Sequence, residues 1–225
     1  MAANVRWGYP NDAIWLQGDE TSNDLTVEML NHAVTMIPSA NQLDFDRLHL
    51  SPSLTCQLFD LIKRRSSSKW KCVRFLDCFG TSVFDVIKTI AFEHSEMVFA
   101  RCISTSNLTQ EAKMSQLGSF IQWSKSGSEL YIFLFQRKVQ DLSELQLWAI
   151  HTAKTDHRIQ ELRLALKDIS QHAGDLFCDL LSSRPCWKRL TFRSCVGPHF
   201  ARLLTLSLQR CKEVAFETFY FEDDA

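Results

Sequence analysis

The chain has 225 residues, of which 45% are hydrophobic and 23% are charged. This balance is typical of a folded protein and excludes an intrinsically disordered chain. Twenty-five basic and 26 acidic residues give a net charge of -1, so we expect neither a nucleic-acid-binding nor a membrane-binding surface. No apolar run approaches the roughly 20 residues that cross a bilayer. The longest run, Leu130 to Phe135, has the length of a single β-strand.

The amino-terminal residues and the cysteines bear on the cellular compartment. Residues 1–18 contain one arginine and no apolar core, so we do not expect a secretory signal. The eight cysteines include no C-x-x-C pair, which excludes a zinc site of that type. We therefore expect reduced cysteines and an intracellular protein, cytoplasmic, or nuclear if the basic run 63–71 directs import. The basic run is better explained as the carboxyl end of a helix, where positive charge suits the helix dipole.

Short apolar runs recur along the chain. In each run two apolar residues are separated by one position, and successive runs begin 24 to 33 residues apart. In most runs a small or apolar residue follows three positions after the second apolar residue, as Cys78, Cys102 and Cys195 do. The repeated unit therefore reads L-x-L-x-x-C/L. The eight pairs are Ile14/Leu16, Leu43/Phe45, Val73/Phe75, Met97/Phe99, Leu130/Ile132, Leu162/Leu164, Leu190/Phe192 and Val214/Phe216.

Segments of helical periodicity separate these runs. Examples are the apolar positions between Leu54 and Ile62 and between Ala173 and Leu181. Ser51-Pro52, Asp141 and Gly197-Pro198 are typical of helix starts, because Ser or Asp caps the first turn and Pro fits its first position. Each unit is therefore predicted to be a strand, a turn, a helix and a return loop.

This pattern resembles the leucine-rich repeat family, in particular its long, ribonuclease-inhibitor-like class. The resemblance covers about residues 12–221, and its units are degenerate, since Asp19 and Lys167 occupy two of the small or apolar positions. It implies an α/β solenoid, or horseshoe, of about seven to eight units, with a parallel inner β-sheet and outer helices. We expect an amino-terminal arm or cap at 1–13, a single repeat domain at 14–221 and an acidic tail at 222–225.

An ordinary α/β domain with a parallel sheet is the competing interpretation, because it also alternates strands and helices. A doubly wound sheet, however, has strands that are buried on both faces. Here Asp44, Arg74, Arg193 and Glu217 stand beside the apolar positions of their strands. We therefore expect one solvated strand face, and we expect the cysteines of the repeat to act as small core residues.

No pattern of catalytic residues is evident in the sequence. It lacks glycine-rich phosphate-binding loops, an H-E-x-x-H sequence and a G-x-S-x-G nucleophile elbow. His151 and His157 are six positions apart, a spacing that does not place two metal ligands on one face of a helix. We predict no enzyme activity, no metal and no cofactor. A site assembled from residues distant in the sequence remains an alternative.

Partners of the resembling family commonly bind the concave strand surface, and the alternation of strand residues indicates which side chains line it. The segment 131–135 is apolar at every position, whereas Asp44, Arg193 and Glu217 supply charge on either side. An apolar centre with a charged rim is typical of a protein interface, although a strand apolar on both sides is also typical of a buried strand. The predicted partner-binding residues are Arg74, Leu76, Val98, Ala100, Tyr131, Phe133, Leu134 and Arg163.

The resemblance thus implies a non-enzymatic module that binds a protein partner of unknown identity through the concave sheet surface. We expect no nucleic-acid or membrane partner, and either a monomer or an edge-to-edge dimer. A structural or truncated repeat array without its own partner is the second interpretation, favoured by the variable spacing. An enzyme with an unrecognised site is the third, because a fold alone does not establish a function.

Overall fold

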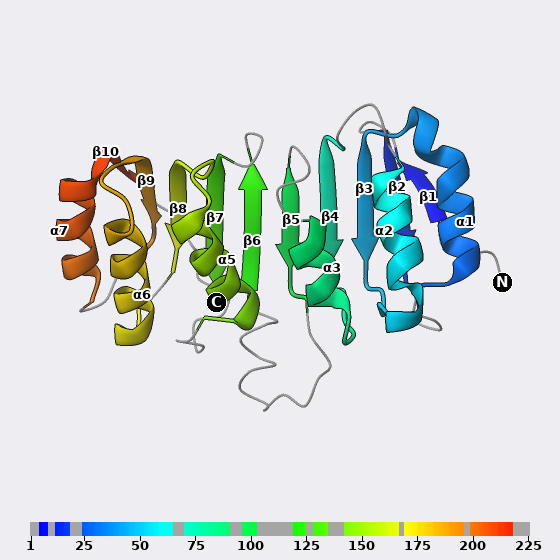
Figure 1. Ribbon diagram of the computed structural model, residues 1–225, viewed down its shortest axis with the longest axis horizontal. Helices are drawn as coiled ribbons and strands as arrows, with labels where there is room; N and C mark the ends of the chain where they lie inside the picture. Colours follow the sequence, from blue (N-terminus) through cyan, green and yellow to red (C-terminus); the bar gives the residue numbers. More distant parts are fainter. Residues whose placement is uncertain are drawn as a thin grey trace, which may run out of the picture.

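The computed structural model (Figure 1) describes residues 5–8, 12–18, 24–64, 70–90, 96–102, 119–124, 128–134, 142–166, 169–195 and 199–217. One sheet of ten strands runs through these residues, and the strands lie side by side in the order of the sequence. Six of the nine neighbouring pairs are parallel, and the pairs β1–β2, β5–β6 and β6–β7 are antiparallel. The strands are β1 (Val5–Gly8), β2 (Ala13–Gln17), β3 (Gln42–Asp46), β4 (Cys72–Leu76), β5 (Met97–Ala100), β6 (Ser119–Ser124), β7 (Glu129–Leu134), β8 (Glu161–Ala165), β9 (Trp187–Arg193) and β10 (Cys211–Glu217).

The described helices lie together on one face of this sheet (Figure 1). They are α1 (Val27–Met36), α2 (Thr55–Lys63), α3 (Val83–Ile90), α5 (Glu144–Thr155), α6 (Gln171–Ser182) and α7 (Phe200–Arg210), with short 3-10 turns η1 (Ile37–Ser39) and η2 (Pro52–Leu54). The chain is thus an α/β protein in which a mostly parallel sheet alternates with helices. The arrangement of the described helices differs from a doubly wound sheet, in which helices cover both faces.

One continuous hydrophobic core joins the helices to the sheet. It contains the apolar pair of each unit from Ile14/Leu16 to Leu190/Phe192, which confirms that these residues face inward. The rings of Phe45, Phe75 and Phe99 follow one another along the core, with centroids 4.8 and 5.9 Å apart. Trp123 continues the row 5.4 Å beyond Phe99. The core is therefore continuous from one strand to the next along the sheet.

Side chains cap the amino-terminal ends of α1 and α5. The Thr26 hydroxyl accepts a hydrogen bond from the Met29 N–H, and Ser143 forms a reciprocal capping box with Gln146. Pro52 begins the turn η2 after Ser51, as the sequence indicates, but the Ser51 side chain makes no capping bond there. The predicted starts at Asp141 and Gly197-Pro198 lie outside the described residues, and the cap of α5 is Ser143.

Four strands end in the same backbone conformation. Arg47, Asp77, Arg101 and Ser194 each follow a strand directly, and their φ angles are all 52–53°. This left-handed region is uncommon for residues other than glycine. The next residue is buried in every case, namely Leu48, Cys78, Cys102 and Cys195. In these four units the residue before the buried Leu or Cys of the L-x-L-x-x-C/L motif therefore has the same left-handed conformation. This conformation turns the chain back toward the core.

The thiols of Cys78, Cys102 and Cys195 make equivalent contacts. Each sulfur donates to a carbonyl of the preceding parallel strand in the sheet. The acceptors are, in the same order, the oxygens of Phe45 at 3.4 Å, Phe75 at 3.4 Å and Leu164 at 3.3 Å. Burial raises the pKa of all three thiols, and that of Cys102 reaches about 12. These cysteines therefore pack and hydrogen-bond as neutral thiols.

We expect the folded protein to be alkylated by iodoacetamide at Cys56 and Cys186 and to be protected at Cys78, Cys102 and Cys195. The first two are exposed, whereas the other three are buried and have raised pKa values, so little reactive thiolate forms. Peptide mass spectrometry after short labelling at pH 8 measures this. Labelling in denaturant should reach all eight cysteines. Equal native labelling rates for Cys56 and Cys102 would contradict the buried position of Cys102.

The sequence does not predict strand β6. The repeat units predicted from the sequence include no strand between the one beginning at Met97 and the one beginning at Leu130. β6 lies between them and is antiparallel to both. This extra strand explains why these two apolar runs are 33 residues apart, the longest spacing in the chain.

Candidate protein-interaction face

The sheet has a second face, opposite the described helices, which we call the open face. Its central row, read across successive strands, is Trp15, Asp44, Arg74, Val98, Gln122, Tyr131, Arg163 and Thr191. The neighbouring row is Gln17, Asp46, Leu76, Ala100, Phe120, Phe133 and Ala165. Because strand side chains alternate between faces, these residues are the ones that stand between the core positions.

The middle of the open face holds an aromatic cluster, which we define as Phe120, Tyr131 and Phe133. All three side chains are half-buried. The Tyr131 ring centroid lies 5.6 Å from that of Phe120 and 6.2 Å from that of Phe133. Val98 and Ala100, on the adjoining strand, are 7% and 6% exposed. The cluster is therefore an apolar surface that is separate from the core between sheet and helices.

Charged side chains hold one side of the cluster in place. The Arg163 guanidinium lies over the Tyr131 ring, 5.3 Å from its centroid, and donates to both Glu217 oxygens at 2.5 and 2.6 Å. Arg193 donates to the Tyr131 hydroxyl at 3.3 Å. The hydrogen bond to Glu217 raises the pKa of Arg163. The link from β8 to β10 passes across β9, where Thr191 is only 5% exposed.

The opposite side of the open face is polar and compact. The Gln42 amide donates to both Asp44 oxygens, at 2.9 and 2.7 Å, and Arg74 lies 3.9 Å from the same carboxylate. Asp44 is 4% exposed, and this burial raises its pKa. The expectation of a solvated position is therefore wrong for Asp44, because Gln42 and Arg74 shield it from water.

The structure brings together most of the predicted binding residues. Arg74, Leu76, Val98, Ala100, Tyr131, Phe133 and Arg163 all belong to the two rows of the open face. The side chain of Leu134 lies outside the described residues. Val98 and Ala100 do not adjoin Tyr131 and Phe133, since β6 separates them.

Sequence reasoning missed Phe120 and Gln122, which lie on β6 in the middle of the open face. A signal for this strand exists in the sequence. The apolar run Phe120-Ile121 and Trp123 is followed by a short polar segment with Gly127, and the next strand begins at once. Two apolar runs joined by such a segment are typical of a β-hairpin.

The polar half of the open face includes one thiol. Cys72, which the β3–β4 register places beside Gln42, is buried, and burial raises the pKa of its thiol to about 11, which opposes nucleophilic reactivity. Across the described ranges, no group of three or more His, Cys, Asp or Glu side chains is placed to hold a metal ion. None of the helices in these ranges is both long and apolar enough to cross a membrane.

Comparison of the chain with family models, with curated proteins and with solved structures found no match. The function proposed below therefore rests on the residues of the chain and their geometry.

Proposed function

We propose that the chain is a short, irregular leucine-rich-repeat solenoid that binds a protein partner through the open face, without catalysis. Several features support the repeat assignment. Strand order follows the sequence, the described helices share one face, and the left-handed residue before the buried Leu or Cys recurs in four units. In a solenoid each unit packs on its sequence neighbours and extends one common core.

The aromatic cluster is the observation that carries the proposed binding function. Phe120, Tyr131 and Phe133 present half-buried rings at the middle of the open face, where a partner can contact them without displacing the core. Tyrosine and neighbouring apolar rings of this kind often supply most of the energy of an interface. Arg163 and Arg193 already hold Tyr131, so binding would cost little additional side-chain entropy.

The charges of the open face indicate the kind of partner. Asp44 is engaged by Gln42 and lies near Arg74, and Arg163 is paired with Glu217, so positive and negative groups largely neutralise one another. A surface of this kind favours a protein that inserts an apolar side chain and surrounds it with neutral polar contacts. We therefore expect binding to depend only weakly on salt, because net charge attraction contributes little.

A quantitative pulldown from lysate of the source cells tests the proposal. Wild-type protein is compared with a Tyr131→Ser/Phe133→Ser variant and with a matched control, Val27→Ala/Leu208→Ala. The control removes two exposed apolar side chains, 43% and 65% exposed, from helices α1 and α7. We expect one protein to be enriched by wild type and control and to be lost from the open-face variant by about ten-fold or more.

Circular dichroism must show that all three proteins are folded. If the open-face variant is folded and still retains every enriched protein, the proposed binding surface is wrong. If neither wild type nor control enriches a protein above a blank resin, the interpretation as a structural array without its own partner is favoured.

A further inference from the structure

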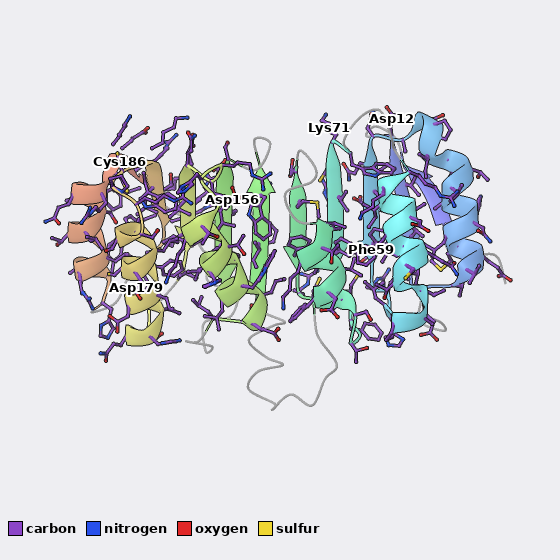
Figure 2. The ribbon with its side chains drawn as sticks, viewed as in Figure 1. Asp12, Phe59, Lys71, Asp156, Asp179 and Cys186 are labelled. Atoms are coloured by element: carbon purple, nitrogen blue, oxygen red, sulfur yellow. The ribbon has the colours of Figure 1, made fainter. Side chains whose placement is uncertain are left out.

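A cavity of about 510 Å³ opens at the edge of the sheet where β8, β9 and β10 begin. It lies apart from the open face. Its walls are formed by His157, Gln160, Ser183, Arg184, Pro185, Cys186, Trp187, Lys188 and Lys212. Three of these residues are basic and none is acidic, so we call this site the basic cavity. Figure 2 labels Cys186, one of its lining residues.

Arg184 supplies a buried positive charge to the basic cavity. It is 7% exposed, and its guanidinium lies 4.2 Å from the centre of the Trp187 ring. Its described hydrogen bonds go to the backbone carbonyls of Ala153, Asp156 and Ile159. Burial lowers the pKa of Arg184, and the charge of the nearby Asp156 carboxylate offsets this shift only in part. An anion placed in the cavity would offset this desolvation.

Three helices end near this cavity, because His157 follows α5, Ser183 follows α6 and Lys212 follows α7. The carboxyl end of a helix carries partial negative charge that repels anions, and α5 ends beside this cavity. Arg184 already engages the carbonyls of Ala153 and Asp156 at that end. Arg184 therefore offsets part of the negative potential at the end of α5, and the further positive charge that an anion needs comes from Lys188 and Lys212.

Two exposed lysines complete the positive lining. Lys212 is exposed at the start of β10, and Lys188 is exposed at the start of β9. The Lys188 ammonium lies 2.6 Å from a Glu161 oxygen, and its side chain, which is 63% exposed, also lines the cavity. Glu161 itself does not line the cavity. A buried guanidinium beside two exposed ammonium groups suits a doubly charged oxyanion.

We propose that the basic cavity binds a phosphate monoester. Its volume accommodates a phosphate group together with part of the group that carries it. The ester could be borne by a phosphorylated serine of a protein or by a small metabolite, since both present the same dianion. This site is independent of the proposed binding function of the open face.

Amide chemical-shift titrations of the full ¹⁵N-labelled chain test this proposal. The probes are inorganic phosphate, a phosphoserine peptide beside its unphosphorylated form, and adenosine monophosphate, with sodium chloride at matched ionic strength. We expect saturable shifts at His157, Lys188 and Lys212 that chloride does not reproduce. A Lys188→Gln/Lys212→Gln variant should weaken binding by about ten-fold or more.

The matched control is Lys63→Gln/Lys71→Gln, which removes the same charge from exposed positions around α2 and β4. Lys71 is labelled in Figure 2. The control should bind as wild type does. Tighter binding of the phosphopeptide or of the nucleotide supports the site and identifies which carrier it favours. Shifts that follow ionic strength alone, or that survive Lys188→Gln/Lys212→Gln unchanged, would overturn the proposal.

Discussion

Replacing Phe75 by alanine is expected to lower the free energy of unfolding by about 3–5 kcal/mol. Phe75 is fully buried, and its ring lies between those of Phe45 and Phe99, with centroid distances of 4.8 and 5.9 Å. The substitution removes a ring from the middle of the core and leaves a cavity whose walls belong to three strands. Urea unfolding followed by circular dichroism measures the change.

Phe216→Ala is the matched control for Phe75→Ala. Phe216 occupies the equivalent strand position on β10, but it is 61% exposed and contacts Phe192 on one side, at 5.9 Å. We expect its removal to cost about 1 kcal/mol or less, because little apolar area returns to water. Equal losses for Phe75→Ala and Phe216→Ala would show that the ring row is not the continuous core described here.

Replacing Arg184 by methionine is expected to cost about 3 kcal/mol of unfolding free energy. Methionine can retain much of the packing of Arg184 on Trp187, but it donates no hydrogen bond. The carbonyls of Ala153, Asp156 and Ile159 would then lose the donor that holds the end of α5 against the following loop. Chemical denaturation gives the size of the loss, and amide exchange of 153–159 should increase first.

Arg158→Met is the control for Arg184→Met. The Arg158 side chain is 58% exposed and pairs with Asp156 at 2.7 Å, so its loss should cost about 1 kcal/mol or less. The two variants together show how much more unfolding free energy is lost with a buried guanidinium that is bonded to the backbone than with a nearby exposed ion pair. If the two variants lost the same stability, Arg184 would not have the structural role inferred from its burial.

The core of this protein could be predicted from the sequence because its signal is local. Pairs such as Leu43/Phe45 and Val73/Phe75 recur, usually with a small or apolar residue three positions later, and the structure buries every pair except the last, Val214/Phe216. Strand alternation then placed Tyr131 and Phe133 on the opposite face. Both inferences need only the geometry of one strand and a repeated spacing.

Other features could not be predicted, because they depend on which strands are neighbours. If residues 97–134 are taken as one repeat unit, the unit has no place for β6. The sequence nevertheless has the pattern of a β-hairpin there, with two apolar runs joined by a short polar segment. The pairing of Arg163 with Glu217 joins residues 54 positions apart across an intervening strand. The burial of Asp44 likewise depends on Arg74, which the β3–β4 register places directly beside it. Sequence alternation alone gives the face of a residue and not its partners.

Site-specific photocrosslinking tests most directly whether the open face is the binding surface. Benzoylphenylalanine replaces Phe133 on the open face in one protein and Leu208 on helix α7 in the other, and both are irradiated in lysate. We predict a covalent adduct from position 133 to the same protein that the pulldown enriches, and no such adduct from position 208. An adduct to that protein from position 208, with none from position 133, would contradict binding through the open face.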